Sequence, residues 1–260
     1  MMSLKFCFIG AGNLATQLSV ALQKAGYQIV QVYSRTDESA KMLAEKLNTQ
    51  YTTQKSELVK DADIYFVALK DSVVNDFLSE IDFTDKLLVH CSGSMPMSVL
   101  RNFTVNYGVL YPLQTFSKNR EVRFKEIPVF IEASNSQIKN QLFEIGEKIS
   151  DSVSELNSEK RKSLHIAAVL ACNFVNHFYA LSAAYLREQE IPFEVLHPLI
   201  LETAQKAVDM PPKQAQTGPA IRFDENIIND HLNTLSDNPR LKELYNSVSR
   251  SIFEFHQKKQ

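Results

Sequence analysis

The sequence predicts an α/β protein, in which a doubly wound, Rossmann-type parallel sheet is followed by an all-α C-terminal domain. In the first half of the 260 residues, short apolar runs alternate with helix-like segments, the pattern of parallel strands joined by crossover helices. A glycine-rich turn, Gly10–Ala15, follows the first apolar run. From Ser158 onward no strand pattern occurs, and helical spacing of apolar residues replaces it.

Six apolar runs in the first half have the length and composition of buried strands. We expect strands at Leu4–Ile9, Gln28–Tyr33, Asp63–Leu69, Leu87–Cys91, Tyr107–Leu110 and Pro128–Ile131. Helices between them are expected at Asn13–Ala25, Glu38–Leu47 and Ser136–Ile149. The first of these helices ends at Gly26, a residue type that commonly terminates helices.

The second half has stop signals that separate long helical patterns. A helix is expected from Ser158 to about Glu190, where Ile191-Pro192 ends it, and another at Leu199–Val208. A last helix begins near Asp237. The sequence therefore predicts a nucleotide-binding domain over residues 1–153 and a helical domain over residues 157–260.

Composition excludes several functional classes. Hydrophobic residues make up 44% of the chain and the formal net charge is -2, so nothing favours a nucleic acid or an anionic membrane surface as partner. The three cysteines are far apart and form no C-x-x-C pair, so neither a disulfide nor a metal site is expected. The N-terminus lacks the features of a signal peptide, and no apolar stretch approaches transmembrane length, so a cytoplasmic protein is expected.

The turn Gly10-Ala11-Gly12-Asn13-Leu14-Ala15 has the G-x-G-x-x-A form of the dinucleotide-binding fingerprint. Gly10 allows a tight turn, Gly12 lets the backbone approach a pyrophosphate, and Ala15 allows close helix–strand packing. The N–H groups at the start of the following helix face the anion. Strand, turn, helix and second strand occur in the required order, so Gly10, Ala11, Gly12, Asn13 and Leu14 are predicted to bind a dinucleotide.

The second strand ends in residues that favour NADP over NAD. An NAD site commonly has an acidic residue here, which binds the ribose hydroxyls. This chain has Ser34, Arg35 and Thr36 instead, a guanidinium and two hydroxyls that suit a ribose phosphate. The alternative is a solvated arginine in a surface turn.

Ligands of open α/β sheets bind beyond the carboxyl ends of the strands, and three such ends have chemically useful residues. Leu69 ends the third expected strand, where it is expected beside the cofactor. Ser92, Gly93 and Ser94 follow the fourth, where N–H groups and hydroxyls can orient a nicotinamide or bind a substrate carboxylate. Gln114 follows the fifth and is a candidate substrate contact. The alternative for Ser94 is a simple capped turn.

Several motifs occur together in one order. They are Gly10–Ala15, His90-Cys91-Ser92-Gly93-Ser94, Tyr111–Phe116, Leu164–Val169 with Asn173-Phe174, and Thr217–Arg222. Together they resemble a family described as NADP oxidoreductases, which pair a Rossmann-like domain with a helical domain of unknown function. The start also looks like pyrroline-5-carboxylate reductases and deazaflavin-dependent NADP reductases, and the Ser92–Pro96 turn looks like the substrate loop of beta-hydroxyacid dehydrogenases. One departure is Tyr111, where the resemblance leads us to expect histidine, so no direct proton transfer is expected there.

The first helix of the C-terminal half has a polar stripe with four-residue spacing, which includes His165 and Asn173. In beta-hydroxyacid dehydrogenases, a corresponding helix presents a lysine and an asparagine to the substrate, and His165 and Asn173 are the nearest equivalents by placement. The alternative is a core histidine with an interhelical hydrogen bond. Arg222 follows Gly218-Pro219 and is a candidate clamp for an acidic substrate, or it belongs to a purely structural turn.

These observations predict an NADP-dependent oxidoreductase that transfers a hydride to or from a small imine or carbonyl compound in an interdomain cleft. Its catalytic residues are predicted to be His165 as proton donor, Asn173 and Ser92. Two alternatives remain: an NADP(H)-binding redox sensor without chemistry, and a deazaflavin-linked NADP reductase with a second cofactor. The apolar face of the long helix, which includes Phe174, predicts a homodimer through the helical domain.

Overall fold

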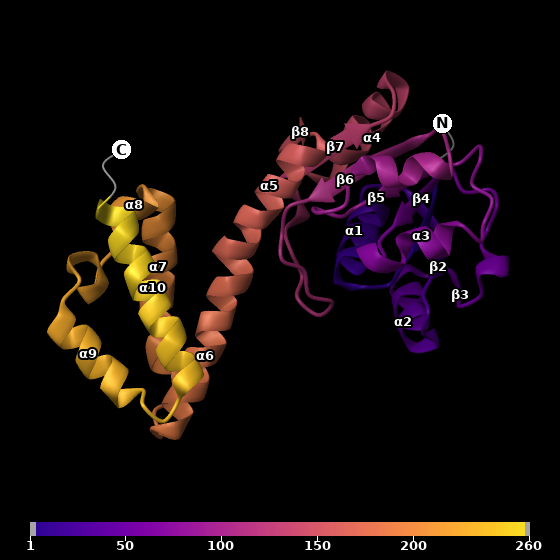
Figure 1. The fold of residues 1–260 in the computed structure, drawn as a ribbon. Helices are drawn as coiled ribbons and strands as arrows, with labels where there is room; N and C mark the ends of the chain where they lie inside the picture. Colours follow the sequence, from indigo (N-terminus) through magenta and orange to yellow (C-terminus); the bar gives the residue numbers. More distant parts are fainter. Residues whose placement is uncertain (1–3, 258–260) are drawn as a thin grey trace. The chain divides into compact units, whose positions relative to one another are not determined.

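The computed structural model describes residues 4–257. By its internal contacts the chain divides into two compact units, residues 1–172 and 173–260, which are described separately. Figure 1 gives the labels of the elements along the chain.

The first unit is built on one eight-stranded sheet with the order β3-β2-β1-β4-β5-β6-β7-β8. Its strands are β1 (Lys5–Ile9), β2 (Gln28–Tyr33), β3 (Gln50–Thr52), β4 (Ile64–Val67), β5 (Leu87–His90), β6 (Tyr107–Pro112), β7 (Val129–Ala133) and β8 (Val153–Glu155). All neighbours pair in parallel except β6 and β7, which are antiparallel. The predicted fold class, a Rossmann-type sheet followed by helices, is confirmed. The prediction did not include β3 and β8, because three-residue edge strands have too little pattern to detect.

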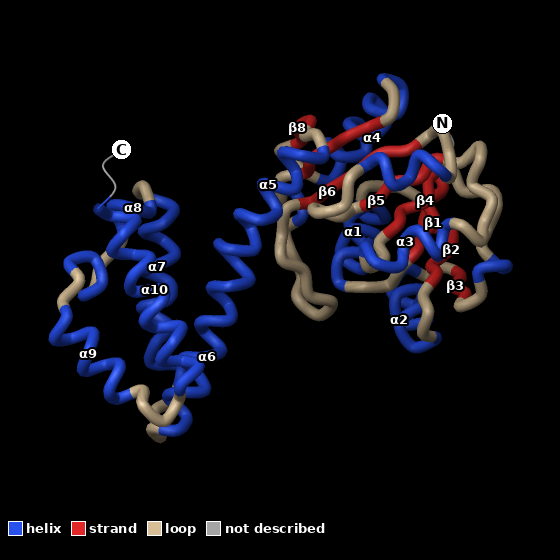
Figure 2. The backbone as a smooth tube through the Cα atoms, viewed as in Figure 1, coloured by secondary structure: helices blue, strands red, loops and turns tan. Residues whose placement is uncertain are grey.

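Helices cover both faces of this sheet. In β1, Phe6 and Phe8 point to one apolar cluster, whereas Cys7 and Ile9 point to the other, as the two-residue period of a strand requires. The first face packs against α1 (Asn13–Lys24), α2 (Asp37–Leu47) and α4 (Ser136–Ile149). The second face is covered by α3 (Val74–Leu78) and the 3₁₀ turn η3 (Met97–Asn102). Figure 2 shows the strands as one layer among these helices.

The strand order reverses direction between β1 and β4. The chain first leaves β1 toward β2 and β3, and then crosses to β4 on the other side. The connections that follow β1 and β4 therefore run to opposite sides of the sheet. In open α/β sheets, ligands bind beyond the carboxyl ends of the strands at such a switch point.

After β8 the chain is helical. A continuous helix comprises α5 (Ser158–Ala168), the π-helical segment η5 (Val169–Phe174) and α6 (Val175–Glu188). The change from strands to helices thus falls where the sequence predicts it, whereas the division between the compact units falls within η5, at Cys172 and Asn173. The π-helical segment was not predicted. Its wider turn alters the four-residue alignment expected along this helix.

The helix Ser158–Glu188 corrects one expectation about the chain. It has 31 residues with a mean hydropathy of 1.4, so by length and composition it could cross a membrane. No charged residue lies between Ser163 and Leu186, and its most apolar window contains no buried residue. The expectation that no apolar segment reaches membrane-spanning length is therefore wrong, because the charges that interrupt apolar runs elsewhere are absent here.

The second unit contains helices joined by turns and has no strand over residues 173–257. After α6 it contains η6 (Phe193–Leu196), α7 (His197–Asp209), α8 (Pro212–Ala215), η7 (Pro219–Arg222), α9 (Glu225–Thr234) and α10 (Pro239–Gln257). Helix α9 was not predicted, because its polar composition obscures the apolar spacing. Among the described residues of this unit, only Ala220, Ile228, Leu235 and Ser249 are buried. The unit has a small core for its length.

Candidate active site

The turn between β1 and α1 has the geometry of a dinucleotide cradle. Gly10 has a φ of 121°, and a Cβ on it would lie 2.4 Å from the Ala68 carbonyl oxygen, so no other residue fits. Gly12 is the N-cap of α1 and makes no side-chain cap. A Cβ on Gly12 would meet nothing within 4 Å, which leaves open space in front of the unpaired N–H groups of the first helical turn. These residues fit the pyrophosphate of a dinucleotide.

The carboxyl end of β2 presents the three residues predicted to bind the ribose phosphate. Arg35 and Thr36 are exposed and Ser34 is half-buried. Within residues 4–257, Arg35 makes no ion pair. Its guanidinium is therefore available to an anionic ligand, although Asp37 in the first turn of α2 adds negative charge nearby.

The turn that follows β5 contacts the first helix after the sheet. Gly93 is buried, and a Cβ there would lie 2.6 Å from His165 Nδ1 and 2.8 Å from Tyr111 Cζ. Only a glycine therefore allows His165, on α5, and Tyr111, on β6, to pack against this turn. The Tyr111 hydroxyl and His165 Nδ1 are 3.1 Å apart, within hydrogen-bond distance. The contact joins a catalytic candidate to the one residue that departs from the expected family pattern.

Tyr111 is placed to select the tautomer of a neutral His165 ring. Burial raises the pKa of Tyr111, against a smaller opposing effect of the Arg161 charge. The phenol therefore keeps its proton at neutral pH and can donate it to Nδ1. When it does so, a neutral His165 imidazole has its own proton on Nε2. His165 itself is half-buried, so this second nitrogen belongs to a side chain that remains accessible.

Two serine hydroxyls of the same turn contact a carboxylate from the end of β4. Ser94 Oγ donates to Asp71 Oδ2 at 2.6 Å, and Ser92 Oγ lies 3.1 Å from the same oxygen. Ser92 Oγ in turn accepts the N–H groups of Ser94 and Met95, at 3.2 and 3.1 Å. Asp71 is exposed and forms no ion pair with any residue in the described part of the chain.

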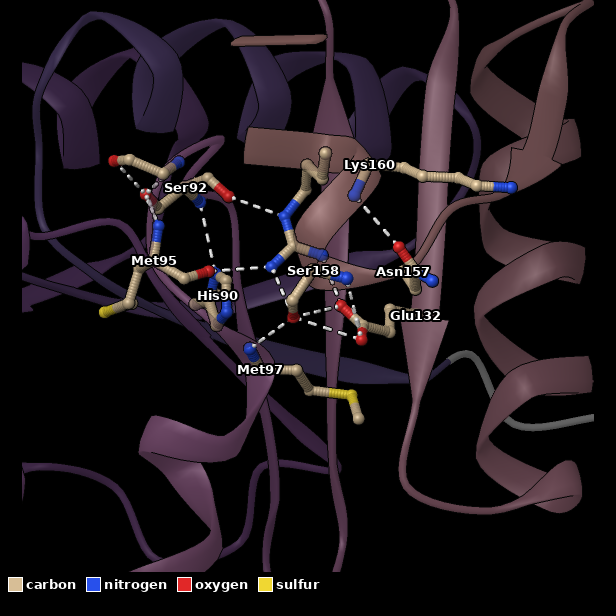
Figure 3. A network of polar contacts seen from close by, with 10 residues as sticks. His90, Ser92, Met95, Met97, Glu132, Asn157, Ser158 and Lys160 are labelled. Atoms are coloured by element: carbon tan, nitrogen blue, oxygen red, sulfur yellow. Dashed lines mark hydrogen bonds and ion pairs between the residues drawn. The ribbon is translucent and has the colours of Figure 1, made fainter. Parts of the chain in front are cut away.

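A buried arginine fastens this turn to helix α5. The Arg161 side chain is 1% exposed and forms an ion pair with Glu132 of β7. It donates to the backbone carbonyl oxygens of Ser92, at 3.2 Å, and Met95, at 2.7 Å. Ser158 donates to the Glu132 carboxylate as well. Figure 3 shows this network, with Ser92 and Met95 on one side and Glu132 with Ser158 on the other.

His90, the last residue of β5, forms a hydrogen bond with the backbone of this turn. Its Nδ1 accepts the Ser92 N–H at 3.2 Å, so the neutral ring has its proton on Nε2. The side chain is fully buried, and Nε2 has no hydrogen-bond partner among the described residues. Burial, together with the nearby Arg161 charge, lowers the pKa of His90 to about 3. His90 is therefore a neutral structural group at physiological pH.

The structure brings together some of the predicted site residues and not others. Ser92, Gly93, Ser94 and His165 lie in one cluster, and Leu69 packs against the second apolar cluster near it. The exposed side chain of Gln114 accepts hydrogen bonds from its neighbour Thr115 and from no other described residue. Asn173 and Arg222 are exposed residues of the second unit. Their roles stay predictions.

Four residues that complete the cluster were not among the predicted site residues: Asp71, Tyr111, Glu132 and Arg161. Asp71 could have been found, because it follows the strand adjacent to the one that ends at Ser92. Arg161 precedes His165 by four residues on the same helix, a spacing that the sequence does show. Nothing in the sequence indicates that Glu132, on an antiparallel strand, pairs with it.

The sheet order, the glycine cradle at the switch point and the cluster beyond β4, β5 and β6 define a dinucleotide-binding protein of the Rossmann class. Residues 5–93 match the family model described as NADP oxidoreductase coenzyme F420-dependent. Residues 127–252 match a domain of unknown function, DUF2520. A crystal structure from Bacteroides fragilis, provisionally described as an NADP oxidoreductase, is 50% identical over 97% of this chain and 98% of that one, with a TM-score of 0.92. The chain belongs to this family of NADP oxidoreductases, with an NADP oxidoreductase domain followed by DUF2520.

More distant proteins have a similar fold. An imine reductase from Myxococcus stipitatus, solved with NADP+, is 16% identical and covers 97% of this chain and 93% of that one, with a TM-score of 0.65. At this identity the similarity shows the fold alone. A pyrroline-5-carboxylate reductase from Pasteurella multocida is 29% identical over 110 residues, which is 39% of this chain and 40% of that protein. The match therefore spans less than half the length of that relative.

Proposed function

We propose that this protein transfers a hydride between NADP(H) and a small imine or carbonyl compound. The observation that carries this proposal is the contact of Tyr111 and His165 across Gly93. It places an acid–base pair at the carboxyl ends of β5 and β6, in the same unit as the glycine cradle. The family membership and the imine reductase among the similar folds agree with this chemistry.

The cofactor is proposed to be held by residues at four strand ends, those of β1, β2, β4 and β5. The turn from Gly10 through Leu14, with Ala11, Gly12 and Asn13, faces the pyrophosphate, and Ser34, Arg35 and Thr36 bind the ribose phosphate. Leu69, Ser92 and Gly93 line the nicotinamide end. When bound, NADPH supplies the hydride. The anionic pyrophosphate is stabilised by the positive end of α1, which has no acidic residue in its first turn.

His165 supplies the proton that reduction of a carbonyl or imine requires. In its protonated form the ring would give its Nε2 proton to the substrate heteroatom and be left neutral, while the Tyr111 hydroxyl next to Nδ1 holds the ring in position. Ser92 is held beside this pair by His90 and Arg161. Ser94, Gln114, Asn173 and Arg222 are the proposed substrate contacts, and their convergence in a cleft between the domains is part of the proposal.

The helical unit is proposed to form a homodimer. Helices α6 and α7 bury none of their residues, although they carry large apolar side chains. Leu201 and Val208 of α7 are 70% and 81% exposed. A second copy of the chain covers such faces in a symmetric assembly. The apolar helix Ser158–Glu188 is then assigned to the contact between subunits, and the protein is proposed to be cytoplasmic.

Turnover tests the function directly and separates it from a non-catalytic NADP(H) sensor. NADPH oxidation is measured by absorbance with 1-pyrroline and cyclopentanone as probe substrates. We expect His165→Gln to lower kcat about 100-fold or more while the NADPH affinity stays within about twofold. Tyr111→Phe is expected to lower kcat less and to shift its pH profile.

The matched control is His177→Gln, which alters an exposed histidine of α6 that forms no hydrogen bond or ion pair within the described part of the chain. Its kcat should equal that of the wild type. Unchanged turnover in His165→Gln would remove His165 from the reaction. Binding of NADPH without oxidation of either probe would favour the sensor instead.

A further inference from the structure

The donors of the Ser92–Met95 turn are already engaged within the protein. Its N–H groups at Ser92, Ser94 and Met95 donate to His90 Nδ1 and Ser92 Oγ. Among the four N–H groups of the turn, only that of Gly93 lacks such a partner. A carboxylate is best held by several donors or by a cation, and this turn offers neither.

The two hydroxyl protons of the turn are engaged as well. The Ser94 hydroxyl donates a hydrogen bond to Asp71. The Ser92 hydroxyl can donate to Asp71 or to Ser94 Oγ, its two acceptors among the described residues. A substrate carboxylate at Ser92 and Ser94 would have to displace Asp71 and would then lie beside its negative charge. The expected carboxylate-binding role of this turn conflicts with these contacts.

The group beside this turn that a ligand can reach is the Asp71 carboxylate, a negatively charged hydrogen-bond acceptor. Asp71 Oδ2 accepts both hydroxyls, and Oδ1 has no hydrogen-bond donor among residues 4–257. Lys70, the preceding residue, is exposed and forms no ion pair with Asp71. An exposed carboxylate that accepts two hydroxyls and has no ion-pair partner among the described residues favours a ligand that brings a positive charge.

We propose, on the basis of the proposed function, that the substrate is a basic imine that reacts as its cation, and that Asp71 selects it. His165, in its protonated form, gives its Nε2 proton to the imine nitrogen, so that the ring N–H bond breaks, the iminium N–H bond forms and His165 is left neutral. Asp71 stabilises that positive charge. Hydride addition at carbon then forms the C–H bond, breaks the C=N π bond and leaves a neutral amine, while NADPH is oxidised to NADP+. A ketone gains no such stabilisation from Asp71.

Ring compounds of matched shape and different charge test this selection without turnover. The probes are pyrrolidine, which is a cation at neutral pH, and tetrahydrofuran-2-carboxylate, an anion with a similar ring. Each is titrated by calorimetry into the NADP+-saturated full-length protein. The wild type is expected to bind pyrrolidine more tightly than the carboxylate. Asp71→Asn, which keeps an acceptor for Ser94, should weaken pyrrolidine binding about five- to tenfold.

Asp76→Asn is the matched control, because it removes the same charge from an exposed residue of α3. Its pyrrolidine affinity should stay within about twofold of the wild type. Ser94→Ala provides a second variant, which leaves the Asp71 charge in place and should retain the preference for the cation. NADP+ affinity and thermal midpoints of all variants are measured alongside.

Three results would overturn the proposal. The wild type could bind the carboxylate more tightly than pyrrolidine, or Asp71→Asn could leave pyrrolidine binding unchanged. Asp71→Asn could also weaken NADP+ instead, which would assign Asp71 to the cofactor. If charge selection holds but no imine is reduced, the proposed function fails while the assignment of Asp71 stands. If 1-pyrroline is reduced equally well by wild type and Asp71→Asn, the function stands and this inference fails.

Discussion

At the level of single residues, Gly93 is needed for packing in the folded protein, whereas Gly12 is proposed to be needed for cofactor binding. Gly93 gives space to His165 and Tyr111, whereas Gly12 faces open space. We expect Gly93→Ala to lower the free energy of unfolding by about 1–3 kcal/mol, since the new methyl group overlaps two side chains. Gly12→Ala should leave this free energy unchanged and weaken NADPH binding. Urea denaturation and calorimetry check the pair, and equal destabilisation of both variants would contradict it.

His90 predicts a specific dependence of stability on pH. Because its pKa in the folded protein is about 3, well below the ordinary value for histidine, the unfolded chain binds one more proton than the folded protein at pH values between the two. Stability contributed by the neutral ring is therefore complete above about pH 6.5 and is lost progressively as the pH falls toward 3. The expected slope is about 1.4 kcal/mol per pH unit for one proton.

The control for this slope is His90→Asn, which keeps an acceptor for the Ser92 N–H and cannot titrate. Free energies of unfolding from urea denaturation are measured between pH 7.5 and pH 4.5 for both proteins. The wild-type curve should fall more steeply than the variant curve below about pH 6.5. Parallel curves would show that His90 takes up its proton in the folded protein as easily as in the unfolded chain.

At the element scale, Arg161 joins α5 to the sheet through β7 and the turn after β5. Breaking a buried ion pair leaves a buried charge, so Arg161→Gln should cost about 3–5 kcal/mol of unfolding free energy. The double variant with Glu132→Gln should cost less than the sum of the two single variants by more than about 1 kcal/mol. Lys162→Gln, an exposed neighbour on α5, serves as the control. Additive effects in chemical denaturation would contradict this coupling.

Most elements of the first unit could be predicted because their signals are local. Strand β2 and helix α4 lie where the sequence predicts them, and the glycine turn that joins β1 to α1 has a recognisable order of residues. The antiparallel pairing of β7 with β6 could not be predicted, because the amino-acid composition of a strand does not indicate in which direction it pairs. The π-helical segment Val169–Phe174 has no signal either, since its residues suit an α-helix equally well.

The active-site cluster was predictable only in part for a related reason. Ser92 and His165 belong to recognisable segments, whereas the link between them passes through Tyr111 and Gly93. That link depends on which side chain of β6 faces α5, which is a property of tertiary packing. The partner of Arg161 likewise comes from a strand 29 residues away in sequence. Contacts of this range follow from topology and not from spacing.

At the scale of the whole molecule, the small core of the helical unit predicts a dimer. Light scattering at micromolar concentration should give twice the chain mass of 29.5 kDa. Replacing two exposed apolar residues of α7, in Leu201→Glu with Val208→Glu, should give the monomer mass, because charges cannot be buried in an apolar contact. Val105→Glu, at a residue of the first unit that is 74% exposed, should remain dimeric. A monomeric wild type, or one recovered with lipid vesicles, would contradict the assembly.

The strand ends of this sheet are proposed to form an NADP site in which Arg35 binds the ribose phosphate. The most direct measurement is calorimetry of NADPH and NADH with the wild type and with Arg35→Ala. We expect the wild type to bind NADPH at least about tenfold more tightly than NADH, and the variant to lose most of that preference while its NADH affinity is unchanged. Equal affinities of the wild type for the two cofactors would contradict the account.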